Sequence, residues 1–159
     1  NAKKMIFSAS LIFVLLNACT PASTPIAATE ASSASAIATV DQFYTWINDA
    51  RSTDDFYKPW DLLSSEVQCH PANRCDLSLF EERWWQSKVV YTLYDCGPNR
   101  VAVQELKYPR EADPASASSA TKYWMYRLSE FEGRLMISEM DLIPSPEEGC
   151  ILVKESATE

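Results

Sequence analysis

The hydrophobic period of the chain changes once, near Ser87, and this change limits the folds open to it. Up to Ser87, apolar residues recur every three or four positions, as they do on one face of a helix. The pattern predicts three helices: Thr39–Arg51, a second that begins after a Ser52 or Thr53 cap and reaches about Val67, and Leu77–Ser87.

Beyond Ser87 apolar residues alternate with period two, which is typical of strands with one buried face. The predicted strands are Val89–Tyr94, a return strand that begins at Val101, Lys122–Glu130 and Arg134–Ile143. Helices followed by a strand meander indicate an α+β domain. We expect N-terminal helices packed on one face of a curved antiparallel sheet of about four strands.

The N-terminal segment has the parts of an export signal. Lys3 and Lys4 precede an uncharged apolar run, Met5–Leu16, which is too short for a membrane-spanning helix of about 20 residues. The run ends in Leu16-Asn17-Ala18-Cys19, which resembles the lipobox of bacterial lipoproteins. The resemblance implies that residues 1–18 are a signal peptide and that Cys19 carries a lipid anchor. A plain secretion signal and a retained anchor are the alternatives.

The resemblance also implies a location, the bacterial cell envelope. In a cell with two membranes, Thr20 after the lipidated cysteine resembles sorting to the outer membrane, facing the periplasm. Residues 19–39 are mostly Ala, Ser, Thr and Pro, a composition that cannot bury enough apolar surface to fold by itself. We therefore expect a disordered tether over 19–39 and one folded domain over 40–159.

The charge balance argues against nucleic acid and against anionic membrane surfaces as partners. The chain carries 14 Lys and Arg against 22 Asp and Glu, and signal cleavage would remove two of the lysines. An acidic surface repels nucleic acid and anionic lipid headgroups. We expect membrane contact only through the lipid anchor, and no nucleic-acid partner.

Four cysteines remain in the folded domain: Cys69, Cys75, Cys96 and Cys150. An even number in an exported chain predicts two disulfides, for which three pairings are possible. We favour Cys69–Cys75 with Cys96–Cys150, because a short loop closes at low entropic cost. A zinc site made by His70 and the cysteines is the alternative, but no Cys-x2-Cys pair is present. We expect no metal and no cofactor.

Three stretches of the domain resemble the nuclear-transport-factor-2-like superfamily: Val40–Tyr44, Asp55–Ser64 and Phe80–Trp85. The order of three helices and a meander also matches, over about Val40 to Ile143. The resemblance implies an α+β cone whose mouth opens between helices and sheet. Members include ketosteroid isomerases, polyketide cyclases and non-catalytic modules of exported bacterial proteins. The lipobox, the tether and the cysteines favour the non-catalytic group.

Isomerase-like chemistry needs a carboxylate base in an apolar pocket and a donor for the developing oxyanion. The candidate acids are Glu105, Glu139 and Asp141, and the candidate donors are Tyr44, Tyr91 and Tyr126. None of them matches a catalytic position of the superfamily, so we assign no catalytic residue. Otherwise the acids face water, and the tyrosines pack with their hydroxyls in contact with water. His70, the only histidine, has no visible partner, and we expect it to be exposed.

Aromatic residues suggest a ligand pocket at the mouth of the cone. The candidate lining residues are Tyr91, Trp84, Trp85, Trp124 and Tyr126. Alternatively, these rings fill the cone as core. Three functions follow: an envelope protein that binds a small apolar ligand or a protein partner, an isomerase- or cyclase-like enzyme, and an assembly module that forms a homodimer through its sheet face.

Overall fold

The computed structural model describes residues 33–113 and 120–156. Helices pack on one face of a five-stranded antiparallel open sheet with the strand order β4-β3-β2-β1-β5. The strands are β1 (Ser87–Asp95), β2 (Arg100–Pro109), β3 (Lys122–Phe131), β4 (Arg134–Ile143) and β5 (Ile151–Glu155). The α+β prediction is therefore confirmed. The signal peptide, Cys19 and the first part of the tether lie outside the described residues.

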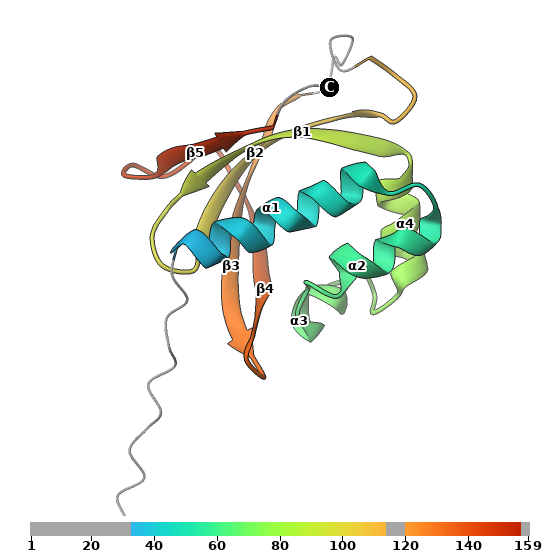
Figure 1. Ribbon diagram of the computed structural model, residues 1–159, viewed down its shortest axis with the longest axis horizontal. Helices are drawn as coiled ribbons and strands as arrows, with labels where there is room; N and C mark the ends of the chain where they lie inside the picture. The colour runs from blue at the N-terminus through green and yellow to red at the C-terminus, as the bar shows by residue number, and fades with distance from the viewer. Residues whose placement is uncertain (1–32, 114–119, 157–159) are drawn as a thin grey trace, which may run out of the picture.

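The longest helix, α1 (Ser33–Asp49), crosses the sheet (Figure 1). Its buried residues repeat at helical spacing: Ala36, Val40, Phe43, Tyr44 and Ile47. The helix begins earlier than the predicted Thr39. Residues 33–39, which their composition assigns to the tether, therefore form the first turns of α1. Ala36 explains the extension, since it is fully buried and anchors these turns to the domain.

The second predicted helix is divided into three short pieces. These are η1 (Thr53–Phe56), α2 (Tyr57–Trp60) and α3 (Ser65–Gln68). Ser52, one of the two predicted caps, caps the first piece together with Asp55. The break comes at Leu63, which forms a parallel bridge with Ile137 of β4. Ser64 N donates to Ile137 O at 2.9 Å, and Ile137 N donates to Leu62 O at 2.8 Å. Pairing with the sheet thus replaces the helical hydrogen bonds.

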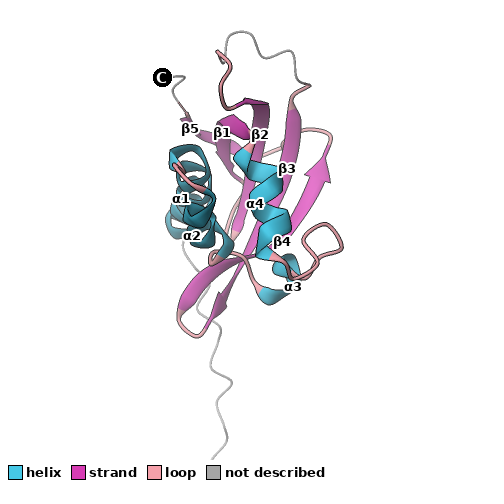
Figure 2. Cartoon of the chain, turned by 90° about the vertical axis from the view of Figure 1, so that its right-hand side faces the viewer, coloured by secondary structure: helices cyan, strands magenta, loops and turns pink. Residues whose placement is uncertain are grey.

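The next helix, α4 (Leu77–Trp85), lies where the sequence predicts it, and Figure 2 shows it in front of the sheet. Asp76 caps this helix through a hydrogen bond from Ser78 N. The four predicted strands are present, and β5 is added beside β1. Every residue of β5 is exposed, so this strand lacks the alternation by which strands are recognised.

Two disulfides join Cys69 to Cys75 and Cys96 to Cys150, the pairing favoured from the sequence. The second holds the end of β1 close to the start of β5. An ion pair adds a further link, because Lys154 Nζ of β5 lies 2.6 Å from Asp41 Oδ1 of α1. The C-terminal strand is therefore attached both to the sheet and to the first helix.

Candidate functional site

Three polar side chains meet in the core between α1 and the sheet. Tyr44 of α1 donates its hydroxyl to Glu105 Oε2 of β2 at 2.9 Å, and the hydroxyls of Tyr44 and Tyr126 are 2.6 Å apart. Glu105 is 3% exposed, and both tyrosines are fully buried. Of the three candidate acids, Glu105 therefore points inward. Its carboxylate is not free, since Lys107 Nζ lies 3.7 Å from the other oxygen, Oε1.

Burial acts on the pKa values of the two phenols in this cluster and of the neighbouring Lys107. It raises the pKa of Tyr44 well above the usual value, and the neighbouring Tyr126 and Glu105 raise it further. The pKa of Tyr126 is raised for the same main reason. Burial lowers the pKa of the Lys107 ammonium, while Glu105 opposes that shift. The two phenols therefore stay protonated and act as hydrogen-bonding members of the core.

The other acid candidates are not desolvated. Glu139 and Asp141 expose 54% and 56% of their side chains and form ion pairs with Arg127 on the neighbouring strand. These two acids face water, the alternative reading of the sequence, and Arg127 is available to pair with them. His70 is exposed, as predicted. In the described parts of the chain, no three His, Cys, Asp or Glu residues gather as a metal site would require.

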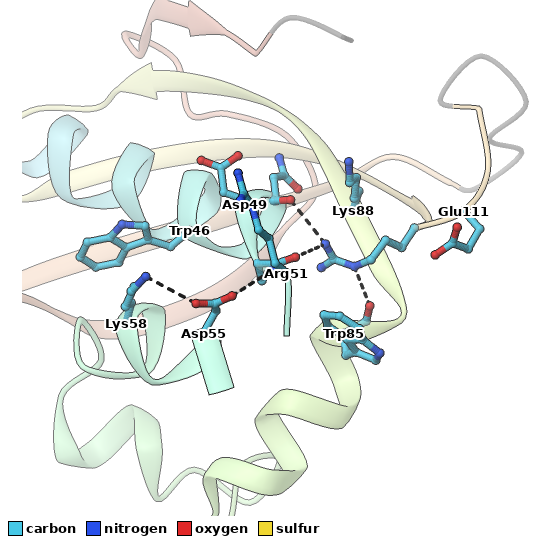
Figure 3. Close-up of a pocket in the computed structure, with 11 residues that line it drawn as sticks. Trp46, Asp49, Arg51, Asp55, Lys58, Trp85, Lys88 and Glu111 are labelled. Carbon is cyan, nitrogen blue, oxygen red and sulfur yellow. Dashed lines mark hydrogen bonds and ion pairs between the residues drawn. The ribbon is translucent and has the colours of Figure 1, made fainter. Parts of the chain in front are cut away.

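A large hollow, which we name the Arg110 pocket, lies at the C-terminal end of α1 (Figure 3). Its volume is about 870 Å³. Charged residues dominate its wall, and Lys58 pairs with Asp55 across 3.5 Å. The wall also contains two indole rings, those of Trp46 and Trp85.

The guanidinium of Arg110 connects α1, α4 and β1 beside this pocket. It donates to five backbone carbonyls at distances of 2.8–3.4 Å: those of Ile47 and Asn48 in α1, Ala50 just after it, Trp85 at the end of α4 and Ser87 at the start of β1. The last carbonyls of a helix have no partner within the helix, and an arginine is suited to them both by its donors and by its charge. Arg110 therefore supplies hydrogen-bond donors to carbonyls at the ends of both helices. Its role in this pocket is to hold these elements together.

A smaller hollow of about 350 Å³ lies between α3, the loop to α4, α4 itself, and strands β3 and β4. We name it the Trp124 pocket. Its apolar wall consists of Leu63, Val67, Ala72, Phe80, Trp84, Trp124 and Met140. Its polar lining residues are Glu66, His70, Asn73, Arg83, Ser138, Glu139 and Asp141.

The short disulfide loop forms one side of the Trp124 pocket. Asn73 Nδ2 donates to Val67 O at 2.8 Å, and the Arg83 guanidinium donates to Ala72 O. His70 Nδ1 accepts from Ala72 N at 3.3 Å. The bridge between Cys69 and Cys75 closes the same loop. The wall is thus held in place by a covalent bond and by hydrogen bonds from two directions.

The opposite wall is aromatic and is fixed by the core. Trp84 is 4% exposed and contacts Phe43 edge to face at 5.9 Å between ring centroids. Lys107 Nζ lies 3.4 Å from the centroid of the Trp84 ring. A cation over an aromatic face is an attractive arrangement. These contacts hold the aromatic wall in place without a ligand.

Two lining residues of the Trp124 pocket carry buried polar atoms that have no hydrogen-bond partner within the described residues. These atoms are the indole Nε1 of Trp124 and the amide Oδ1 of Asn73. Because Asn73 Nδ2 is engaged with Val67 O, the orientation of its amide is determined. Buried polar atoms are almost always paired, so each exception requires an explanation. None of the unpaired atoms belongs to the lining of the Arg110 pocket.

The five predicted pocket residues separate into three groups. Trp84 and Trp124 line the Trp124 pocket, and Trp85 lines the Arg110 pocket. Tyr91 and Tyr126 line neither, because both are core residues; Tyr91 stacks on Tyr44 at 4.7 Å and donates to Asp41. Sequence reasoning missed Asn73, a single amide in a loop, whose role depends on the folded position of Val67 O.

Comparison with protein-family models, with curated proteins and with solved structures found no match to this chain. Within the described helices, none is both long and apolar enough to cross a membrane. The function is therefore argued from the two pockets and the core cluster.

Proposed function

We propose that this chain is a non-enzymatic lipoprotein of the bacterial cell envelope, anchored through Cys19, which binds a small apolar ligand in the Trp124 pocket. The observation that carries the proposal is this pocket, whose apolar wall includes the rings of Phe80, Trp84 and Trp124. Its volume of about 350 Å³ lies in the range of small-molecule sites, roughly 300–1,000 Å³.

The order of the elements agrees with the cone expected from the superfamily resemblance. Three helical regions precede an antiparallel meander, and the Trp124 pocket lies between helices and sheet. The two disulfides support an oxidising, extracytoplasmic location. Both observations favour an exported binding module of this superfamily.

The isomerase- or cyclase-like alternative receives little support from the buried acid. A general base must come within hydrogen-bonding distance of the proton it removes. Glu105 accepts from Tyr44, pairs with Lys107 and lines neither pocket. A substrate in the Trp124 pocket would therefore have no direct contact with this carboxylate.

A second candidate function, assembly into a homodimer, rests on the sheet face away from the helices. Tyr94, Tyr123 and Leu152 belong to that face, and Leu152 is 53% exposed. Small-angle scattering separates the two functions. A monomer in solution contradicts assembly and leaves the binding proposal unaffected.

The pocket is tested by filling it. Met140 and Met136 both lie half-buried on β4, but only Met140 lines the Trp124 pocket. Met140→Trp should abolish retention of a co-purifying ligand in native mass spectrometry, whereas Met136→Trp should retain it. Equal retention by both folded variants would contradict the proposed site.

The anchor is tested separately by fractionating cells. Cys19→Ala should move the protein from the membrane fraction to the soluble fraction, because the thiol that would carry the lipid is absent. A protein that stays with the membranes after this substitution would contradict the lipid anchor without affecting the pocket.

A further inference from the structure

The two disulfides of the domain differ in their accessibility. Cys69 and Cys75 are both exposed, and they lie six positions apart in the segment between α3 and α4. Cys96 and Cys150 are both half-buried and lie 54 positions apart, beside the ends of β1 and β5. A thiolate must reach a sulfur atom to exchange with it, so access favours the first bridge.

The backbone around the two bridges differs as well. Arg74 and Cys75 both have a left-handed backbone conformation, with φ of 54° and 56°. This conformation is unfavourable for a residue with a side chain, because its Cβ approaches the following carbonyl oxygen. Beside the second bridge, the left-handed positions are Gly97 and Gly149, which have no Cβ. Left-handed strain is therefore present at the first bridge and avoided at the second.

Both differences make the first bridge the easier one to reduce. Breaking its S–S bond lets the loop leave the strained conformation, so the strain favours the dithiol form. Exposed or strained disulfides are the ones that take part in exchange reactions. The short separation of the two cysteines also keeps their thiols close together after reduction, so the bridge can re-form at low entropic cost.

The loop that this bridge closes forms one side of the Trp124 pocket, through His70, Ala72 and Asn73. Within the loop, Asn73 N and Arg74 N both donate to His70 O at 2.8 Å. Asn73 Nδ2 also donates to Val67 O at 2.8 Å. Without the bridge, such hydrogen bonds would have to hold the loop in place, and local opening should become more frequent.

We propose that Cys69–Cys75 is a redox-active disulfide, which exchanges with an external dithiol while the domain stays folded and thereby loosens this side of the Trp124 pocket. One external thiolate attacks a sulfur of the bridge, the S–S bond breaks, a mixed disulfide forms, and the released cysteine thiolate takes up a proton. The second external thiolate attacks the mixed disulfide and releases the other cysteine. The bridge gains two electrons and two protons, and the external dithiol is oxidised to a disulfide.

The exchange is tested on the full chain in detergent micelles, with dithiothreitol as the dithiol and no denaturant. Free thiols are alkylated at intervals and located by peptide mass spectrometry, while circular dichroism reports the fold. We expect Cys69–Cys75 to open at least about tenfold faster than Cys96–Cys150, with an unchanged spectrum, and to re-form in glutathione disulfide. Equal rates, or opening only together with unfolding, would overturn the exchange site.

The contribution of the backbone is tested with Arg74→Gly. Glycine adopts the left-handed conformation without strain, so the bridge should become about threefold harder to reduce, measured as the equilibrium constant with dithiothreitol. Arg74→Ala is the matched control, because it removes the guanidinium but keeps a Cβ, and it should behave like the wild-type chain. An unchanged constant for Arg74→Gly, or equal shifts for the two variants, would overturn the role of strain.

The loosened loop is tested by hydrogen exchange. The amides of Asn73 and Arg74 should exchange at least about tenfold faster in the reduced chain. The double variant Cys69→Ser with Cys75→Ser, kept oxidised so that the other bridge stays closed, should show the same faster exchange. Unchanged protection of both amides in the reduced chain would overturn the link to the pocket. None of these measurements uses a pocket ligand, so this proposal and the proposed function can fail separately.

Discussion

The Arg110 pocket and the Trp124 pocket differ in how completely the protein satisfies its own buried polar groups. In the first, one guanidinium meets five carbonyls at or near the ends of α1 and α4. In the second, an indole N–H and an amide oxygen have no partner within the described residues. The larger pocket, of about 870 Å³, therefore has no unpaired buried polar atom among its described lining residues, whereas the smaller one, of about 350 Å³, has two. Volume alone therefore does not identify the ligand site.

This difference separates two roles that a hollow can have. A pocket whose polar groups bind one another is held together by them, and changing one of them should destabilise the fold. A pocket with a mainly apolar wall can instead be filled by a ligand that removes this wall from water. Mutations in the two pockets should consequently affect different measurements.

The largest effect on stability is expected for Arg110→Ala. Five carbonyls lose their donor together, so the free energy of unfolding should fall by about 3 kcal/mol, as for loss of a hydrogen-bonded network. Urea unfolding measures this change. Lys88→Ala, in the same pocket, is the control and should change stability by less than about 0.5 kcal/mol. Equal losses in the free energy of unfolding for the two variants would contradict a structural role for Arg110.

Next in size is Tyr44→Phe, which extends the comparison to the core cluster. The substitution removes the hydroxyl that contacts both Glu105 and Tyr126, and leaves a buried carboxylate with one donor fewer. A loss of about 2 kcal/mol in the free energy of unfolding is expected for a hydrogen bond to a charged group. Retention of a co-purifying ligand should not change, because Tyr44 does not line the Trp124 pocket. Weaker binding by a stably folded variant would place the cluster in the site after all.

The same cluster predicts a dependence of stability on pH. The pKa values of Tyr44 and Tyr126 are raised by burial, so the folded state holds protons that the unfolded chain releases above about pH 10. Their contribution is fully present below that pH and falls above it by about 1.4 kcal/mol per pH unit for each tyrosine. Urea unfolding between pH 8 and pH 11 measures this slope. Tyr126→Phe should reduce it, and an unchanged slope would indicate that this phenol ionises equally in both states.

The smallest effect is expected for Trp124→Phe in the absence of ligand. Removing an unpaired N–H offsets the loss of ring contacts, so stability should change by less than about 1 kcal/mol. Trp84→Phe is the matched control in the same pocket. It should cost more, because Trp84 is buried and contacts both Phe43 and Lys107. If thermal melting gives Trp124→Phe the larger loss, the indole N–H is not an unsatisfied group.

Much of the fold could be predicted because burial is periodic in the sequence. The alternation in β1 places Val89, Tyr91 and Leu93 in the core, and α1 buries one face. Prediction failed where a tertiary contact determines the local structure. The bridge between Leu63 and Ile137 divides the second helix, and β5 is held by pairing with β1 and by the link from Cys150.

The candidate site was predictable only in its aromatic part. Trp84 and Trp124 are recognisable as large rings near the expected mouth, but exposed and core rings look alike in a sequence. Tyr91 and Tyr126 therefore entered the prediction although both are buried. Asn73 and Arg110 carried no signal, because their importance comes from the carbonyls that the fold places beside them.

The bridge between Cys96 and Cys150 has a consequence for the domain under proteolysis. The two cysteines are 54 positions apart, and β2, β3 and β4 all lie between them. One cut of the backbone anywhere in that interval leaves both fragments joined through sulfur. A nicked molecule therefore keeps its full mass until a reductant reaches the bridge, and loss of the C-terminal half takes two chemical events in place of one.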